Sequence, residues 1–318
     1  MRSNSIISTN YLKISVVVAT FNRRESLKRL LESLLQQTLS QAFFEVIVVS
    51  DGSTDGTVEM LHQIQGHFGS LKIIDLMNRG PGAARNAGAR VASGDFLAFT
   101  DDDCIASEDW LEQIGLVFER TGAVAVQGRT TTDRLARSPL THQMEILTPQ
   151  PTTLPTCNVA YAKSAFEAVG GFDESFTFAH NEDADLAWRV EELGKIVFAP
   201  TAHIMHPPRR DLFWKRACWV RFLQSEFRLY YKDQDKYQKY RSLSPWWNIY
   251  WNVFVVGQVQ MIKSNCKYLI YPFKPQYFIV GIGLVAARWI NLIRFYPAYY
   301  NAYRFYCKRT PANGHRNS

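Results

Sequence analysis

Short apolar segments alternate with segments of helical periodicity over the first half of the chain. Four of them have the length and composition of buried strands, namely 14–19, 44–49, 72–74 and 96–99. Segments with the signature of helices lie between them, at 27–35, 55–65 and 83–92. Strands that alternate with helices at these lengths lie parallel and are joined by right-handed crossovers. The pattern therefore predicts an α/β fold with a doubly wound, Rossmann-like sheet.

The first predicted helix has the clearest amphipathic pattern. One face carries leucine at five positions, which are Leu27, Leu30, Leu31, Leu34 and Leu35. Asn22 precedes the helix and Glu25 follows three residues later, as in a variant of the capping box. We therefore expect Asn22 to cap this helix.

The pattern changes in the second half. Periodicity fades over 129–155, where Thr and Pro accumulate, so we expect loops there. Two further helices are expected at 163–169 and 182–193, the second capped by Asn181, and a strand at 196–199. Beyond residue 206, aromatic and basic residues predominate. We expect two regions, 12–206 and a basic, aromatic-rich helical region at 207–318.

Two apolar stretches of the C-terminal region, 246–262 and 277–293, approach the ~20 residues that a membrane-spanning helix needs. Both contain polar residues, which are Asn248, Asn252, Gln258, Gln260, Arg288 and Asn291. An arginine near the centre of a span costs about 2.5–3.5 kcal/mol on insertion scales. Interfacial or re-entrant helices tolerate such residues better, and Trp and Tyr flank both stretches, as in aromatic belts. An ordinary helical subdomain that buries its aromatic residues is the alternative.

Charge divides the chain at a similar place. Residues 1–203 contain 17 Lys+Arg and 25 Asp+Glu, a net charge of −8. Residues 204–318 contain 19 Lys+Arg and 4 Asp+Glu, a net charge of +15. Basic segments attract nucleic acid or anionic lipid at the cytoplasmic leaflet, so the two regions are expected to have different partners.

Cysteine usage and the N-terminus point to a cytosolic environment. The five cysteines are widely spaced and form no C-x-x-C pair, which argues against a disulfide framework and a cysteine zinc site. The first ten residues lack the basic-then-apolar pattern of a secretory signal. Together with the basic region, this predicts a protein at the cytoplasmic face of a membrane, peripheral or integral through residues 207–318.

Polar clusters follow each of the four predicted strands. Ligands of a doubly wound sheet bind outside the carboxyl ends of its strands, so these clusters define the expected site. They are Thr20-Phe21-Asn22-Arg23, Ser50-Asp51-Gly52-Ser53, the segment 78–86 and Asp101-Asp102-Asp103.

The acidic triplet is the most informative cluster. Three adjacent carboxylates repel one another, and a divalent cation such as Mg²⁺ or Mn²⁺ removes that cost while binding substrate phosphate oxygens. A solvated acidic turn that caps a helix near Ser107 is the alternative for the triplet alone. The three other strand-end clusters favour the metal site.

The remaining clusters fit a nucleotide. Asp51 can accept hydrogen bonds from a base or ribose, or form an Asx turn before Gly52. Gly80 lets the backbone approach a phosphate, and Arg85 offers a charge-assisted bond to a diphosphate. The motif does not continue as G-x-G-x-x-G, because position 85 is Arg, so a dinucleotide oxidoreductase is disfavoured.

Six ordered motifs resemble those of the family 2 glycosyltransferases of the GT-A fold. The resemblance covers roughly residues 12–206. The motifs are VVVATFNRRESL (16–27), VSDGSTDGT (49–57), NRGPGAARNAG (78–88), FTDDD (99–103), VGGFDE (169–174) and Glu182-Asp183 with Arg189 downstream.

The resemblance implies roles for residues at matching positions. The nucleoside would be held by Thr20, Phe21, Arg23 and Asp51, and the donor-binding loop would contribute Gly80, Arg85 and Asn86. Asp101 and Asp103 match the outer positions of the D-x-D motif, with Asp103 on the metal, Asp101 on the metal or ribose, and Asp102 among the donor-binding residues. Asp183 of the E-D pair would be the general base of an inverting transfer. Enzymes of this fold often complete the metal site with a histidine, for which His206 is the candidate.

Physical chemistry agrees with the role of Asp183. An acceptor hydroxyl must lose its proton as it attacks the sugar, and a carboxylate within reach contributes about 10²–10⁴-fold. The alternative for Glu182 and Asp183 is dipole complementarity at a helix N-terminus, worth only about 0.3–1 kcal/mol.

We therefore expect a Mn²⁺- or Mg²⁺-dependent inverting glycosyltransferase. Its donor would be a nucleotide-diphosphate sugar, a UDP-sugar being expected, and its acceptor a glycan or a lipid-linked glycan. The alternative from another class is a non-catalytic nucleotide- or nucleic-acid-binding protein that uses the basic region, against which the acidic first half argues. A nucleotidyltransferase is disfavoured because the usual Gly-rich start after the first strand is missing.

Overall fold

The computed structural model describes residues 13–134, 138–176, 178–270 and 273–309. The expected N-terminal boundary at residue 12, the polar first ten residues and residues 310–318 lie outside them. The chain forms two compact units. Unit 1 comprises Met1–Thr132, Glu145–Thr177 and Glu182–Pro207, and unit 2 comprises Asp133–Met144, Phe178–Asn181 and Pro208–Ser318.

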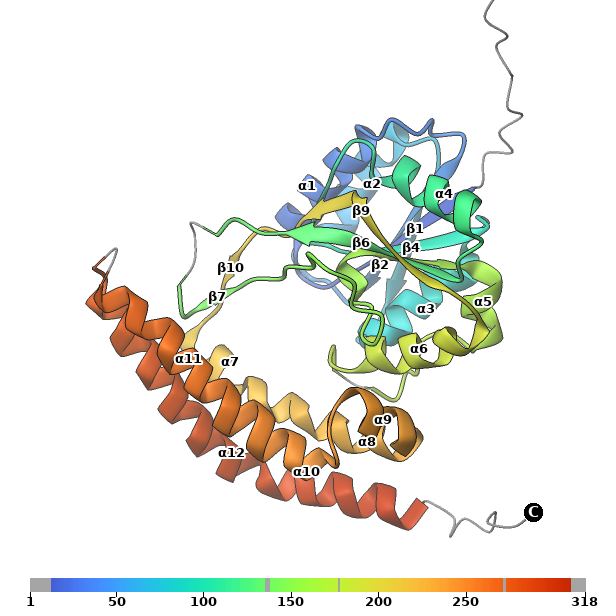
Figure 1. Ribbon diagram of the computed structural model, residues 1–318. Coiled ribbons are helices and arrows are strands. Elements are labelled where there is room, and N and C mark those ends of the chain that lie inside the picture. Colours follow the sequence, from blue (N-terminus) through green and yellow to red (C-terminus); the bar gives the residue numbers. More distant parts are fainter. Residues whose placement is uncertain (1–12, 135–137, 177, 271–272, 310–318) are drawn as a thin grey trace, which may run out of the picture. The chain divides into compact units, whose positions relative to one another are not determined.

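Unit 1 is built on an eight-stranded sheet with the strand order β3-β2-β1-β4-β8-β6-β9-β5 (Figure 1). The first four strands in this order are parallel, and β8 is antiparallel to both of its neighbours. The strands are β1 (Ile14–Thr20), β2 (Phe44–Asp51), β3 (Leu71–Leu76), β4 (Phe96–Asp101), β5 (Ile105–Ala106), β6 (Ala125–Thr131), β8 (Val159–Ala162) and β9 (Ile196–Met205).

Helices cover both faces of this sheet, with α1 and α2 on one face and α3 on the other (Figure 1). The helices of unit 1 are α1 (Arg24–Leu35), α2 (Thr57–Ile64), α3 (Pro81–Val91), α4 (Trp110–Thr121), α5 (Lys163–Ala168) and α6 (Glu182–Val190), and the 3₁₀ turns are η1 (Gln65–His67), η2 (Thr156–Asn158) and η3 (Glu191–Leu193). The predicted doubly wound α/β fold is confirmed, and the strand order reverses between β1 and β4.

Close packing of α3 on the sheet requires a glycine. A Cβ atom on Gly88 would lie 2.5 Å from Cγ1 of Val17 on β1 and 3.2 Å from Cγ2 of Val49 on β2. No real Cβ tolerates the shorter distance, so only glycine lets α3 lie this close. The second half of α3, whose first residues belong to the motif at 78–88, is thereby fixed against β1 and β2.

The predicted leucine face of α1 is buried, but the predicted cap is wrong. Asn22 has a φ of +53° and its Oδ1 accepts a hydrogen bond from the N–H of Thr54. The N–H of Arg24, at the start of α1, instead donates to Oδ2 of Asp55 at 3.0 Å. A residue from the loop after β2 therefore replaces the local cap.

Asn181, which we predicted to cap α6, is engaged within unit 2. It has a φ of +73°, its Nδ2 donates to Oε1 of Glu226 at 2.8 Å, and its Oδ1 accepts from Arg241 at 3.2 Å. At the start of α6 the N–H of Ala184 donates to Oδ1 of Asp183 at 2.8 Å. The Asp183 side chain, which lies in the first turn of α6, thus accepts a hydrogen bond from one of the N–H groups that have no partner within the helix.

The second half differs from the expectation mainly between 125 and 162. We predicted loops from residue 129, whereas β6 continues to Thr131 and pairs with both β8 and β9. The predicted helices at 163–169 and 182–193 are observed as α5 and as α6 with η3. The predicted strand at 196–199 is the start of the longer β9.

Unit 2 is helical apart from the two-stranded β7–β10 sheet. Its elements are β7 (Thr141–His142), β10 (Arg209–Arg210), α7 (Phe213–Ala217), η4 (Cys218–Gln224), α8 (Ser225–Lys232), α9 (Gln234–Tyr240), α10 (Pro245–Trp247), η5 (Asn248–Val256, a π-helix), α11 (Gly257–Cys266), η6 (Lys267–Leu269) and α12 (Pro275–Arg309). The predicted C-terminal helical region rich in aromatic residues is confirmed.

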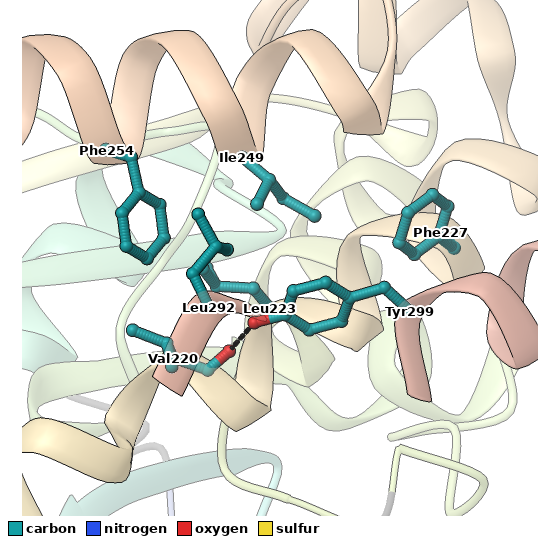
Figure 2. Packing of buried hydrophobic residues seen from close by; sticks show 7 residues of the cluster. All are labelled: Val220, Leu223, Phe227, Ile249, Phe254, Leu292 and Tyr299. Carbon is teal, nitrogen blue, oxygen red and sulfur yellow. Dashed lines mark hydrogen bonds between the residues drawn. The ribbon is translucent and has the colours of Figure 1, made fainter. Parts of the chain in front are cut away.

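Figure 2 shows the core of unit 2, in which side chains from η4, α8, η5 and α12 meet. The hydroxyl of Tyr299 donates a hydrogen bond to the carbonyl of Val220, so the buried phenol is satisfied without water. The core residues are Val220, Leu223, Phe227, Ile249, Phe254, Leu292 and Tyr299.

Candidate active site

The polar clusters after β1, β2 and β4 lie at one edge of the sheet. Strand register pairs Thr20 with Ser50 and Ala19 with Asp101, so these three parallel strands end at the same level. Asp51, at the end of β2, pairs with Leu76 at the end of β3. The edge includes the point between β1 and β4 where the strand order reverses, which is where ligands of such sheets bind.

Asp102 links the first and fourth clusters. Its Oδ2 accepts a hydrogen bond from Oγ1 of Thr20 at 2.8 Å, and its Oδ1 lies 2.8 Å from a guanidinium nitrogen of Arg23. Burial raises the pKa of this carboxyl to about 6, against the attraction of Arg23 and with repulsion from Asp103 and Asp101. Asp102 thus faces the loop after β1, and its raised pKa reflects its burial beside the two other carboxyl groups of the triplet.

Asp103 and His206 form the part of the site best suited to a cation. Nε2 of His206 lies 3.3 Å from Oδ1 of Asp103, and these atoms and the Cys104 sulfur are all within 4.8 Å of one another. Nδ1 of His206 lies 3.3 Å from the carbonyl oxygen of Pro207, and Nε2 faces Asp103. A carboxylate oxygen suits Mn²⁺ or Mg²⁺ when phosphate oxygens complete the shell, and an imidazole nitrogen favours Mn²⁺ of the two.

Cys104 is the least suited of these three residues. Burial raises the pKa of its thiol well above the usual range, and the sulfur lies 3.9 Å from the carbonyl of Cys157. A metal-binding cysteine is a thiolate, whereas this one stays protonated. Asp101 lies outside this group of three, and its Oδ1 is instead 3.1 Å from Arg85.

Arg85 is the charge that connects the acidic triplet to α6. One terminal nitrogen of its buried guanidinium lies 3.1 Å from Oδ1 of Asp101, and the other lies 3.3 Å from Oε1 of Glu182. The guanidinium carbon lies 5.7 Å from the centre of the Phe172 ring. One cation on α3 therefore bridges the carboxyl groups of a residue at the end of β4 and a residue at the start of α6.

Glu182 and Asp183 are adjacent carboxylates in unequal environments. Glu182 is buried, and its Oε2 has no hydrogen-bond partner within the described part of the chain. Burial, and then repulsion from Asp183, raise the pKa of Glu182 despite the nearby Arg85. Asp183 is only half-buried. The environment thus favours a proton on Glu182, while Asp183 is the more accessible of the two.

Asp51 organises the loop after β3. Its Oδ1 accepts from the N–H of Arg79 at 2.7 Å and its Oδ2 from the N–H of Gly80 at 2.8 Å. Gly80 has a φ of +91°, where a side chain would be strained. Asp51 therefore holds the loop that leads into α3, a role that the sequence did not suggest, and its contact with the nucleoside stays a prediction.

Asn86 clamps the segment that carries the VGGFDE motif. Its Nδ2 donates to the carbonyl of Phe172 at 2.8 Å and to Oε1 of Glu174 at 3.1 Å, and its Oδ1 accepts from the N–H of Phe172 at 2.9 Å. The amide is thus fully used inside the protein. Phe21 behaves differently, because half of it is exposed (50%) and its ring is open to a flat ligand.

The sequence did not reveal Glu182 as the partner of Arg85 or Glu174 as the partner of Asn86. Both glutamates stand in motifs that were recognised, Glu182 beside the expected base and Glu174 at the end of VGGFDE. Their positions were therefore visible in the sequence. Their partners, 97 and 88 residues away in the chain, were not.

The fold is that of the GT-A glycosyltransferases. Two solved structures of this kind resemble the described chain. TarS from S. aureus (residues 1–349) has a TM-score of 0.56 at 19% identity and covers 95% of this chain and 93% of its own. The mannosyltransferase PcManGT from Pyrobaculum calidifontis, solved with GDP-Man and Mn²⁺, has a TM-score of 0.59 at 17% identity and covers 89% and 88%.

The chain belongs to glycosyl transferase family 2, whose sequence model matches residues 15–173. It is 36% identical over 116 residues to Glycosyltransferase AglE of Haloferax volcanii (36% of this chain, 38% of that protein). It is 31% identical over 217 residues to Pre-mycofactocin glycosyltransferase of Mycobacterium tuberculosis (63% and 43%). The matches thus span less than half of these relatives. Membership of this family favours glycosyl transfer over the alternative of a non-catalytic binding protein.

Proposed function

We propose that this glycosyltransferase moves a sugar, with inversion, from a nucleotide-diphosphate donor to a hydroxyl of a glycan or lipid-linked acceptor. The observation that carries the proposal is the Arg85 bridge, which joins Asp101 at the end of β4 to Glu182 beside Asp183. Through this bridge, the acidic triplet and the Glu182-Asp183 pair both lie beside the buried guanidinium of Arg85. A UDP-sugar is the expected donor, and TarS, which resembles this fold, has been solved with UDP and with UDP-GlcNAc.

Asp183 is proposed as the general base. The acceptor oxygen forms a bond to C1 of the donor sugar while the bond from C1 to the diphosphate breaks, and the hydroxyl proton passes to the Asp183 carboxylate. The nucleoside diphosphate leaves with the bonding electrons. The raised pKa of Glu182 favours its neutral form, so Glu182 is not the residue proposed to accept this proton.

A divalent cation, Mn²⁺ or Mg²⁺, is proposed at Asp103 and His206, with Asp101 as a further ligand. Such an ion, when bound, stabilises the negative charge on the departing diphosphate. The convergence of Asp103 Oδ1 and His206 Nε2 supports this placement. Asp101 reaches the ion only by sharing its carboxylate with Arg85, which holds one of its oxygens.

The nucleoside is proposed to lie against the loops after β1 and β2. The exposed ring of Phe21 can stack on a base, and Asp51 keeps a lone pair on each oxygen for a base or ribose donor. Thr20 and Arg23 would act from the same loop while holding Asp102, which then completes the donor site. Asn86 and Gly80 shape the donor loop.

Residues 12–206 are proposed as the catalytic domain and residues 207–318 as the region that meets the acceptor's environment. The basic charge of the second region suits the anionic lipid of a cytoplasmic leaflet. Membrane contact there would bring the enzyme to a lipid-linked acceptor. Nucleic acid is not expected as a partner.

The test is to incubate the full chain with nucleotide-diphosphate sugars and Mn²⁺ and to measure release of the nucleoside diphosphate. We expect turnover that EDTA abolishes, and a loss of about 10²–10⁴-fold in Asp183→Asn. Asp75→Asn, an exposed aspartate on β3, is the matched control and should keep full activity. Turnover by Asp183→Asn equal to the wild type would refute the base assignment, and turnover that ignores EDTA would refute the metal.

A further inference from the structure

The middle of α12 exposes apolar residues, whereas the two polar residues of this part, Arg288 and Asn291, are turned into unit 2. Ile279, Ile290 and Ile293 are 69%, 67% and 76% exposed. Asn291 is only 4% exposed, and Arg288 donates to the carbonyl of Arg216 at 3.4 Å. The arginine that argued against a membrane contact is therefore turned away from the face that meets the surroundings.

The preceding helical stretch, η5 with α11, repeats this arrangement. Val256, Val259 and Ile262 are exposed, whereas Gln258 and Asn265 are buried. A water-soluble helix normally shows the opposite distribution, with polar residues outside. Along both segments, exposed Ile and Val residues therefore alternate with buried Asn and Gln residues, although Gln260 of α11 is exposed as well.

These two segments pack tightly against each other and run side by side along one side of unit 2 (Figure 1). A Cβ atom on Gly281 of α12 would lie 2.2 Å from Nδ2 of Asn265 on α11, so no side chain larger than hydrogen fits there. Their exposed apolar residues therefore belong to adjoining helices. We call these residues, together with Trp247, Trp251 and Trp289, the apolar face.

Tryptophan is concentrated at one part of the apolar face. Trp247, Trp251 and Trp289 are all between 40% and 49% exposed. They line a shallow hollow of about 520 Å³ together with Trp246 and Tyr250. Exposed tryptophan at this density is typical of surfaces that meet the boundary between lipid headgroups and acyl chains.

Basic residues lie at both ends of the apolar face, and acidic residues are missing. Lys263, Lys267 and Lys274 lie around the turn between α11 and α12, and Arg294 and Arg304 lie in the second half of α12. Lys274 and Arg294 are about 30 Å apart along a helix. No Asp or Glu follows Asp235 in the sequence. This charge complements an anionic surface.

We propose that the apolar face lies flat on an anionic lipid bilayer, with its Ile, Val and Trp side chains at the acyl boundary and its basic ends among the headgroups. The exposure of α12 supports a lipid contact. Only 33% of its most apolar 18-residue stretch is buried, whereas the core helix of a soluble protein would be mostly buried. Basic residues at both ends of the apolar face favour helices that lie along the membrane surface over helices that cross the membrane. A helical hairpin across the membrane would carry the three lysines of its turn to the far side, against the positive-inside rule.

The test is flotation of the full chain with vesicles of phosphatidylcholine, alone or with roughly a third phosphatidylglycerol, at about 0.1 M and 1 M NaCl. We expect binding to the anionic vesicles that salt weakens. The double variant Ile290→Ser/Ile293→Ser should bind at least tenfold more weakly, because two exposed anchors are lost. Leu193→Ser, an exposed leucine of unit 1, is the matched control and should bind like the wild type.

A second pair of variants tests the charge. Lys263→Gln/Lys267→Gln should weaken binding at low salt, whereas Lys28→Gln/Arg29→Gln on α1 should not. Alkaline carbonate should release the wild type, and its retention in the vesicles would mean a span and overturn the proposal. Equal binding of the wild type and Ile290→Ser/Ile293→Ser would also overturn it. So would a dimer in solution that ignores vesicles and that this double variant converts to a monomer.

The lipid proposal is independent of the proposed donor and base. Vesicle binding is measured without substrates, so its failure would leave the transfer reaction untouched. Conversely, a chain that binds vesicles and fails to turn over any nucleotide sugar would refute the proposed function alone.

Discussion

The carboxylate of Glu226 holds Asn181 in the left-handed conformation that directly precedes Glu182. Its Oε1 accepts from Nδ2 of Asn181 at 2.8 Å. Its Oε2 accepts from the Tyr237 hydroxyl at 2.7 Å and from Nδ2 of Asn248 at 3.0 Å. Three buried donors from three parts of unit 2 therefore depend on one buried acceptor.

Removal of this acceptor should destabilise the protein. Glu226→Ala removes the acceptor that these three buried donors share, and we expect the free energy of unfolding to fall by about 3 kcal/mol or more. Glu226→Gln keeps one acceptor oxygen and should cost less. Urea unfolding followed by circular dichroism measures both. Asp235→Ala, an exposed acidic residue of the same unit, is the control, and a midpoint for Glu226→Ala equal to that of the control would contradict the prediction.

Arg85 should not be replaceable by lysine. Lysine keeps the charge but lacks the two terminal nitrogens that reach Asp101 and Glu182 at once. We expect Arg85→Lys to lower kcat at least tenfold and to lower the melting temperature. Arg90→Lys, on the same helix but with an exposed side chain, should leave both unchanged. Full activity of Arg85→Lys would show that the bridge is not needed.

Metal affinity should depend on one of two nearby histidines. His206→Ala removes the nitrogen that lies 3.3 Å from Asp103, and we expect the Mn²⁺ concentration for half-maximal activity to rise about 10–100-fold. His203→Ala is the control, because that ring is bonded to Ser107 and Thr131 instead. Isothermal titration with Mn²⁺ gives the same comparison without a substrate. An unchanged affinity in His206→Ala would exclude this ligand.

Acid stability should depend on Glu45, which is buried on β2. Although burial opposes its ionisation, the ion pair with Lys72 and hydrogen bonds from Ser93 and Ser15 lower the pKa of this carboxyl to about 2. A depressed pKa in the folded state stabilises the protein above the ordinary value near 4.5, and this contribution is lost as the pH falls from 4.5 toward 2.

Glu45→Gln should therefore cost about 2 kcal/mol at neutral pH and flatten the decline in stability below pH 4.5. Thermal unfolding at several pH values measures this, with Glu32→Gln on the exposed face of α1 as the control. A variant whose stability falls with acid as steeply as that of the wild type would contradict the assignment.

The sequence predicted the elements whose signals are local. The strands β1 to β4 are continuous apolar runs, and the leucine face of α1 repeats at helical spacing. The strands β6 and β8 were missed because their signals are weak. In β6 the buried Gln127 interrupts the apolar pattern, and its Oε1 accepts from the N–H of Gln150, whereas β8 has only four residues.

The motifs did not predict the hydrogen-bond partners of the site residues, because these partners are distant in the sequence. The motifs identified Asp51, Arg85 and Asn86, but not that each bonds to other parts of the protein. The cap of α1 failed for the same reason, since Asp55 supplies it across the loop after β2. Local sequence patterns indicate which residue types gather at the edge of the sheet. They do not reveal hydrogen-bond partners that come together only when the chain folds.

The antiparallel strand β8 also sets an order for folding during synthesis. The strands β1 to β4 are neighbours both in the chain and in the sheet, so this half can assemble as soon as residue 101 has left the ribosome. By contrast, the sheet neighbours of β6 are β8 and β9, which are made later, and Thr130 of β6 is also bridged to Ile146. The nascent chain therefore carries β6 without its sheet neighbours until Val159–Ala162 has emerged, and we expect the growing polypeptide to need protection from aggregation most in this interval.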